Sequence, residues 1–76
     1  MDIKCQIKLN HTSDVEEFVK SASKCNFDID VFYNRIVIDA KSILGVLSLD
    51  LSNILTVQYS ERDPYFETTL TKFCVT

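Results

Sequence analysis

Residues 39–51 read Asp-Ala-Lys-Ser-Ile-Leu-Gly-Val-Leu-Ser-Leu-Asp-Leu and form the densest apolar stretch of the chain. Ser42 stands just before the apolar run, where a serine hydroxyl can accept hydrogen bonds from the open amides of a first helical turn. Three aliphatic residues follow at i, i+1 and i+4, the spacing of one helical face: Ile43, Leu44 and Leu47. We therefore predict a short helix over residues 42–48. Because so short a helix is marginal in isolation, we expect it to dock on a sheet.

The sheet is predicted by segments in which apolar and polar residues alternate. Alternation with period two indicates a strand with one buried and one wetted face. In the second such segment, we expect Phe27, Ile29 and Val31 to point inward. Asn34 and Arg35 form a predicted two-residue hairpin turn, since asparagine tolerates positive φ. Four strands are predicted in all, at residues 2–9, 27–33, 36–40 and 55–59.

Two longer amphipathic helices flank these strands. Ser13-Asp14-Val15-Glu16 matches a capping box, with Ser13 as the cap and Glu16 reaching back. We therefore predict a first helix over residues 14–24. Asp63-Pro64 is a strong helix start, with aspartate as the cap and proline at the first helical position. It predicts a last helix over residues 64–74.

The resulting order is βαββαβα within one domain spanning residues 1–76. Four strands that each have one buried and one solvent-facing side, together with three amphipathic helices, indicate an α+β fold. We expect an open-faced sandwich, in which a four-stranded antiparallel sheet is covered on one face by three helices.

Composition narrows the classes of function. A net charge of −3 and an isoelectric point near 4.9 argue against nucleic-acid binding, which needs a basic patch. No apolar run approaches the ~20 residues of a membrane helix, so we expect a cytoplasmic protein without membrane insertion. A single glycine excludes a glycine-rich phosphate loop. Three cysteines without zinc-site spacing, Cys5, Cys25 and Cys74, are interpreted as incidental thiols; we expect no metal and no cofactor.

Residues 40–49, A-K-S-I-L-G-V-L-S-L, closely resemble the central segment of the histidine-containing phosphocarriers (HPr) of the bacterial sugar phosphotransferase system. The predicted strand and helix order also suits that family. The resemblance implies that Ser42 matches a serine phosphorylated by a dedicated kinase. It also implies that Ile43, Leu44 and Leu47 form a docking patch for partner proteins. Core packing is the alternative for this patch, and we expect Leu44 to be in the core and Leu47 to be more exposed.

His11 is the only histidine, and the resemblance places it at the phosphorylated histidine of the family motif G-x-H-x-R-P-A. The motif is degraded here, because Leu9, Ser13, Asp14 and Val15 replace its glycine, arginine, proline and alanine. The arginine would have helped to hold the phosphoryl charge. The acidic residues that follow His11 at the helix start oppose that charge: Asp14, Glu16 and Glu17.

Three roles remain open for His11: an exposed loop residue, a phosphoacceptor, or a metal ligand. We interpret the chain as a non-enzymatic, divergent HPr-like module that acts in regulation or protein binding. Its expected partners are phosphotransferase-system proteins, or a serine kinase or transcriptional regulator. The alternative is a genuine phosphocarrier that relays a phosphoryl group through His11. A structural domain that only reuses the fold is a third option, since fold does not fix function.

Overall fold

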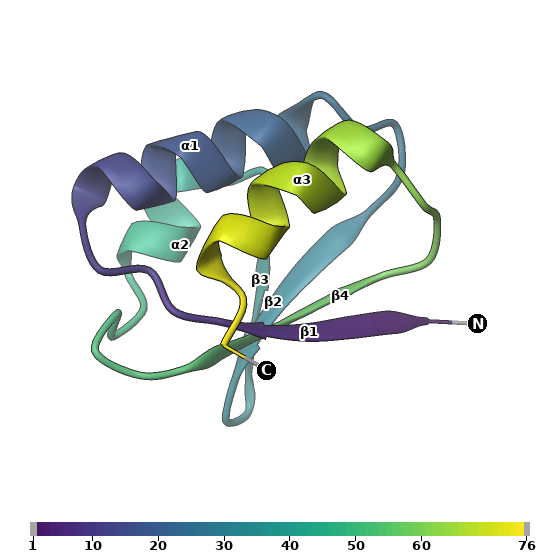
Figure 1. Ribbon diagram of the computed structural model, residues 1–76. Helices are drawn as coiled ribbons and strands as arrows, with labels where there is room; N and C mark the ends of the chain where they lie inside the picture. The colour runs from purple at the N-terminus through teal and green to yellow at the C-terminus, as the bar shows by residue number, and fades with distance from the viewer. Residues whose placement is uncertain (1, 76) are drawn as a thin grey trace.

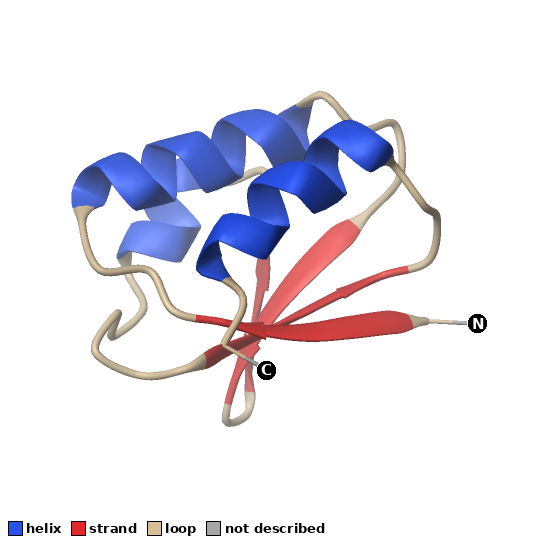
Figure 2. Cartoon of the chain, viewed as in Figure 1, coloured by secondary structure: helices blue, strands red, loops and turns tan. Residues whose placement is uncertain are grey.

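The computed structural model describes residues 2–75. Its four strands form one antiparallel sheet in the order β1-β4-β2-β3. All three helices lie on one face of this sheet and leave the other face open (Figures 1 and 2). The elements are β1 (Ile3–Ile7), α1 (Thr12–Ser23), β2 (Ile29–Tyr33), β3 (Ile36–Asp39), α2 (Ile43–Leu47), β4 (Leu55–Tyr59) and α3 (Pro64–Phe73). The predicted α+β open-faced sandwich is therefore confirmed.

Strand register explains which residues face the helices. Val57 of β4 pairs with Cys5 of β1 on one side and with Val31 of β2 on the other, and Val31 also pairs with Ile38 of β3. This row contributes to the core, whereas the adjacent row faces open solvent. Phe27, Ile29 and Val31 are buried as expected, and the turn residue Asn34 has a φ of 53°. Alternation in the sequence therefore predicted both sheet faces correctly.

The two longer helices, α1 and α3, cover the core on the helical face of the sheet. Phe18 of α1 and Phe66 of α3 have ring centroids 6.2 Å apart, and Phe66 meets the ring of Tyr59 edge-on at 5.3 Å. Asp63 caps α3, since its Oδ1 accepts hydrogen bonds from the amides of Tyr65 and Phe66 at 3.0 Å each. The predicted start of the last helix is thus confirmed. These aromatic contacts tie α1, α3 and β4 together.

The start of α1 differs from the prediction. The helix begins at Thr12, two residues early, and Ser13 is an exposed residue inside its first turn and not its cap. His11 holds the N-cap position, and Asp14 takes the role that we assigned to Glu16. Leu9 is fully buried, which anchors the chain just before the helix and leaves only Asn10 to connect it with the cap. The sequence contains two overlapping capping patterns, His11–Asp14 and Ser13–Glu16, and the helix uses the earlier one.

Helix α2 sits on β3 through its single glycine. A Cβ on Gly45 would lie only 2.7 Å from Cγ2 of Ile38, so the helix backbone approaches the strand closely. Val46, next to it, is fully buried. The Oγ of Ser42 accepts a hydrogen bond from the amide of Gly45 at 3.1 Å, which confirms Ser42 as the N-cap. The prediction for Leu44 is wrong, because docking through Gly45 and Val46 turns the Leu44 side of the helix toward solvent.

We predict that Gly45→Ala lowers the free energy of unfolding by about 1 kcal/mol. Alanine favours a helix by up to ~1 kcal/mol over glycine, but forced overpacking costs ~1–3 kcal/mol. Urea denaturation of four proteins tests this: wild type, Gly45→Ala, Ile38→Ala and the double variant. In the Ile38→Ala background the nearest obstructing methyl group is gone and only the Ser42 side chain stays close, so Gly45→Ala should destabilise clearly less than it does in wild type. An effect of Gly45→Ala that has the same size in both backgrounds would contradict the close approach to Ile38.

Candidate functional site

Helix α2 presents an apolar face to solvent. Leu44 is 79% exposed, and Ile43 and Leu47 are each 39% exposed. These three residues lie at i, i+1 and i+4, so they share one side of the helix, turned away from Gly45. We call them the α2 face. Apolar side chains gathered on a single exposed face are typical of a surface that contacts another protein.

Ser42 lies directly before the α2 face in an exposed position. Its hydroxyl oxygen caps α2, and its backbone carbonyl accepts a hydrogen bond from the amide of Val46 at 3.0 Å. The side chain is therefore held in one place while remaining accessible to an enzyme. A charge added at this oxygen would lie at the edge of the α2 face.

His11 is exposed at the beginning of α1. Its backbone carbonyl accepts hydrogen bonds from the amide of Asp14 at 3.0 Å and from the amide of Val15 at 3.3 Å. His11 therefore caps the start of the helix through its backbone. The residue therefore stands where the resemblance placed it, at the tip of the first helix. Its role as a phosphoacceptor stays a prediction.

The same tip carries the carboxylate of Asp14. Its Oδ2 accepts hydrogen bonds from the amides of Asn10 at 3.0 Å and of His11 at 3.2 Å. A negative charge thus already occupies the amide-rich tip beside the histidine. An incoming phosphoryl group would meet a fixed like charge there.

The other two acidic residues contribute less to the tip than the sequence indicated. Glu17 forms an ion pair with Lys72 of α3, with Oε2 and Nζ 2.5 Å apart, so this carboxylate is directed toward the neighbouring helix. Glu16 is exposed. The opposition to a phosphoryl group therefore comes mainly from Asp14.

One cation lies close to this tip, and the sequence reading missed it. Nζ of Lys8 donates to Oδ1 of Asn10 at 3.2 Å and to the backbone carbonyl of Leu51 at 2.9 Å. These contacts hold its ammonium group beside the residue that precedes His11. Nothing in the sequence pattern singles out Lys8, because its contact with Leu51, 43 positions away, forms only on folding.

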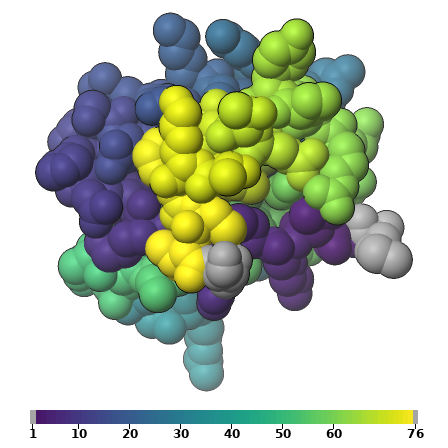
Figure 3. All heavy atoms as spheres, in the orientation of Figure 1, coloured from purple at the N-terminus to yellow at the C-terminus, as the bar shows by residue number. Residues whose placement is uncertain are grey.

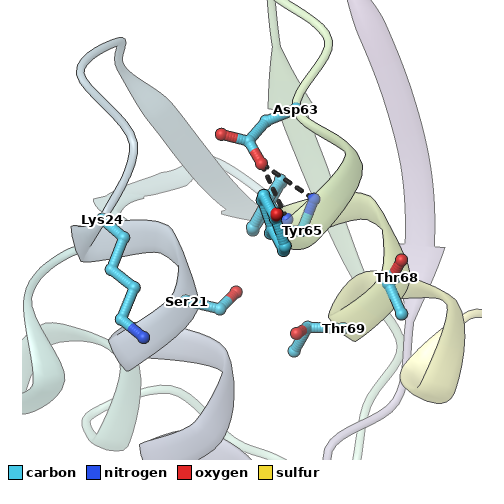
Figure 4. Close-up of a pocket in the computed structure, with 7 residues that line it drawn as sticks. Ser21, Lys24, Asp63, Tyr65, Thr68 and Thr69 are labelled. Carbon is cyan, nitrogen blue, oxygen red and sulfur yellow. Dashed lines mark hydrogen bonds between the residues drawn. The ribbon is translucent and has the colours of Figure 1, made fainter.

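The two candidate regions lie at the same end of the molecule. Helices α1 and α2 pack against each other, and Figure 1 shows α2 beneath the half of α1 in which that helix begins. At the opposite end, a hollow of about 630 Å³ opens between α1 and α3 (Figure 4). Lys24 and Tyr65 line that hollow, and neither belongs to the predicted site.

Within residues 2–75, no group of three histidine, cysteine, aspartate or glutamate side chains is placed to hold a metal ion. None of the helices in this range has the length and apolar character needed to cross a membrane.

Comparison with solved structures identifies the fold. The crystal structure of the phosphocarrier protein HPr from Bacillus anthracis str. Ames matches with a TM-score of 0.71 and 21% identity, over 96% of this chain and 95% of that chain. The crystal structure of HPr-C-His from Thermoanaerobacter tengcongensis matches with a TM-score of 0.73 and 26% identity, over 95% and 88% of the two chains. No family model and no curated protein sequence matches. The chain therefore has the HPr fold at low sequence identity.

We predict that Asp14→Ala lowers the free energy of unfolding by about 1 kcal/mol, because two backbone amides lose their acceptor. Glu16→Ala is the matched control, since it removes an exposed carboxylate from the same turn. We expect the control to change stability by less than ~0.5 kcal/mol. Thermal unfolding of both variants measures the difference. Equal losses in the two would contradict the assignment of Asp14 to the helix tip.

Proposed function

We propose that this protein is a divergent member of the HPr family that acts as a regulatory or protein-binding module of the phosphotransferase system. The exposed α2 face carries this proposal, because three aliphatic side chains are left in solvent on a helix that otherwise docks well. The resemblance to HPr implies that this helix corresponds to the family's docking region, which supports the proposal. The module is not an enzyme, and its partners are phosphotransferase-system proteins or a serine kinase or transcriptional regulator in the cytoplasm.

Ser42 is the proposed regulatory phosphorylation site. Its hydroxyl is exposed and sits beside the α2 face, so a phosphate would place nearly two negative charges at the edge of an apolar contact surface. Partners with a basic residue opposite this edge would bind more tightly, and partners with an acidic one would bind less tightly. Phosphorylation would thus select among partners without refolding the domain.

The alternative is a phosphocarrier that uses His11. The ammonium group of Lys8 beside Asn10 favours it, since a cation near the histidine would offset part of the phosphoryl charge. Lys8 supplies one point charge, however, and its nearby contacts already hold it. Asp14 lies at the helix tip itself and opposes the same charge. The balance of charges favours the regulatory role.

The docking proposal predicts that Leu44→Asp weakens binding to the HPr serine kinase at least tenfold. A tenfold loss corresponds to about 1.4 kcal/mol, and removal of a central apolar contact commonly costs more than that. Tyr65→Ser is the matched control, because Tyr65 is also a highly exposed large side chain but lines the hollow between α1 and α3, away from the α2 face. Calorimetric titration measures both affinities. Unchanged binding by Leu44→Asp would refute docking through the α2 face.

The phosphorylation proposal predicts that the same kinase, supplied with ATP, places phosphate on Ser42. Ser42→Asn should abolish the reaction while preserving the fold, since asparagine is an equally good helix cap without a phosphorylatable hydroxyl. Ser48→Ala is the control, because Ser48 is the exposed serine at the other end of α2. Mass mapping of the phosphopeptide reports the site. Phosphate that persists in Ser42→Asn, or none in wild type, would overturn the assignment.

A further inference from the structure

The thiols of Cys5 and Cys74 lie together although the two residues are 69 positions apart in the sequence. Their sulfur atoms are 3.0 Å apart, about 1 Å longer than an S–S bond of roughly 2.05 Å. Cys5 belongs to β1, and Cys74 follows the last residue of α3. The sequence reading, which treated all three cysteines as incidental, missed this contact because it arises only on folding.

The backbone around the two cysteines is already fixed. Cys74 forms an isolated antiparallel bridge with Ile7 of β1. The amide of Lys8 donates to the carbonyl of Phe73, and the amide of Val75 donates to the carbonyl of Gln6, each at 2.9 Å. The end of the described chain therefore lies along the outer edge of β1, and Figure 3 shows these yellow residues against the purple strand. Little backbone movement is needed to join the sulfurs.

A small reagent can reach the pair. Both cysteines are only partly buried, and both line a hollow of about 230 Å³ at the surface. Lys4, Arg62 and Glu67 also line this hollow, and the guanidinium of Arg62 is paired with the carboxylate of Glu67, so the lining favours neither sign of charge strongly. Glutathione disulfide is a small disulfide of the kind that can approach the sulfurs from this open side. Cys25 is instead buried, with its sulfur near Asp63 and the carbonyl of Ser21.

We propose that Cys5 and Cys74 are a redox modification site, at which glutathione disulfide or a similar small disulfide drives formation of an intramolecular disulfide. One cysteine thiolate attacks the glutathione disulfide and expels a glutathione thiolate. The second cysteine thiolate then attacks the protein sulfur of this mixed disulfide and expels the second glutathione. Two protein thiols and one glutathione disulfide thus give one protein disulfide and two glutathione thiols, whose protons come from the cysteines.

The crosslink fastens the segment that covers the edge of β1. An exposed strand edge invites pairing with other chains, and a covering segment prevents it. Burial and the neighbouring Cys74 thiol raise the pKa of Cys5 to about 12, so thiolate is scarce at neutral pH and exchange is slow. A low thiol pKa would stabilise the reduced protein as a thiolate and make the disulfide easy to reduce, and the raised pKa of Cys5 removes that effect. The site is therefore slow to oxidise and stable once it is oxidised.

The test is incubation of the full chain with glutathione disulfide at mildly alkaline pH. We expect wild type to lose two of its three thiols and about 2 Da of mass, and peptide mapping to recover Cys5 joined to Cys74. Cys25→Ala, the matched control, should form the same crosslink. Cys5→Ser and Cys74→Ser should each carry only a glutathione adduct. Oxidised wild type should unfold at a temperature higher by roughly 10 °C or more, reversibly with dithiothreitol.

Three results would overturn the proposal. Glutathione adducts on wild type that never resolve to a disulfide would show that the sulfurs cannot meet. A disulfide that includes Cys25, or a covalent dimer formed in place of the internal crosslink, would show that another pair reacts first. An internal Cys5–Cys74 crosslink that lowers the unfolding temperature would show that it strains the native structure.

Discussion

The close approach of Gly45 to Ile38 decides how α2 presents itself. Only a residue without a side chain lets the helix backbone come so near β3, and that approach brings Val46 into the core. Once these two contacts are made, the geometry of a helix leaves Leu44 and its neighbours facing water. The proposed docking surface is thus a direct consequence of how the helix is anchored, and Ser42, as its cap, is fixed at the edge of that surface.

The tip of α1 leads to the opposite conclusion for His11. The histidine stands at the N-cap of α1, but the carboxylate of Asp14 accepts hydrogen bonds from the backbone amides of Asn10 and His11 there. A phosphoryl group that is to be transferred needs an open binding site with positive polarity, such as free backbone amides at a helix N-terminus. Lys8 supplies some positive charge nearby, yet it does not replace a bidentate guanidinium at the tip. The charges around the two predicted positions therefore favour a role for Ser42 over one for His11.

The sequence predicted the fold through local signals. Alternation defined the sheet faces, Asp63-Pro64 defined the start of α3, and Ser42 defined the start of α2. It failed where two local patterns compete, as with His11–Asp14 and Ser13–Glu16 at the start of α1. Periodicity also grouped the residues of the α2 face correctly but did not reveal that Leu44 points outward, because the anchor contact with Ile38 is tertiary. The contact between Cys5 and Cys74 also could not be predicted from local sequence patterns, because the two residues are 69 positions apart.

The most direct test of the account is phosphotransfer to His11. The protein is incubated with the general phosphotransferase enzyme and phosphoenolpyruvate, and acid-labile phosphate is followed over time beside an authentic HPr. The account predicts that His11 stays largely unphosphorylated while the authentic carrier is fully charged, and that Asp14→Ala accepts phosphate faster than wild type. Rapid, stoichiometric phosphorylation of wild-type His11 would contradict it.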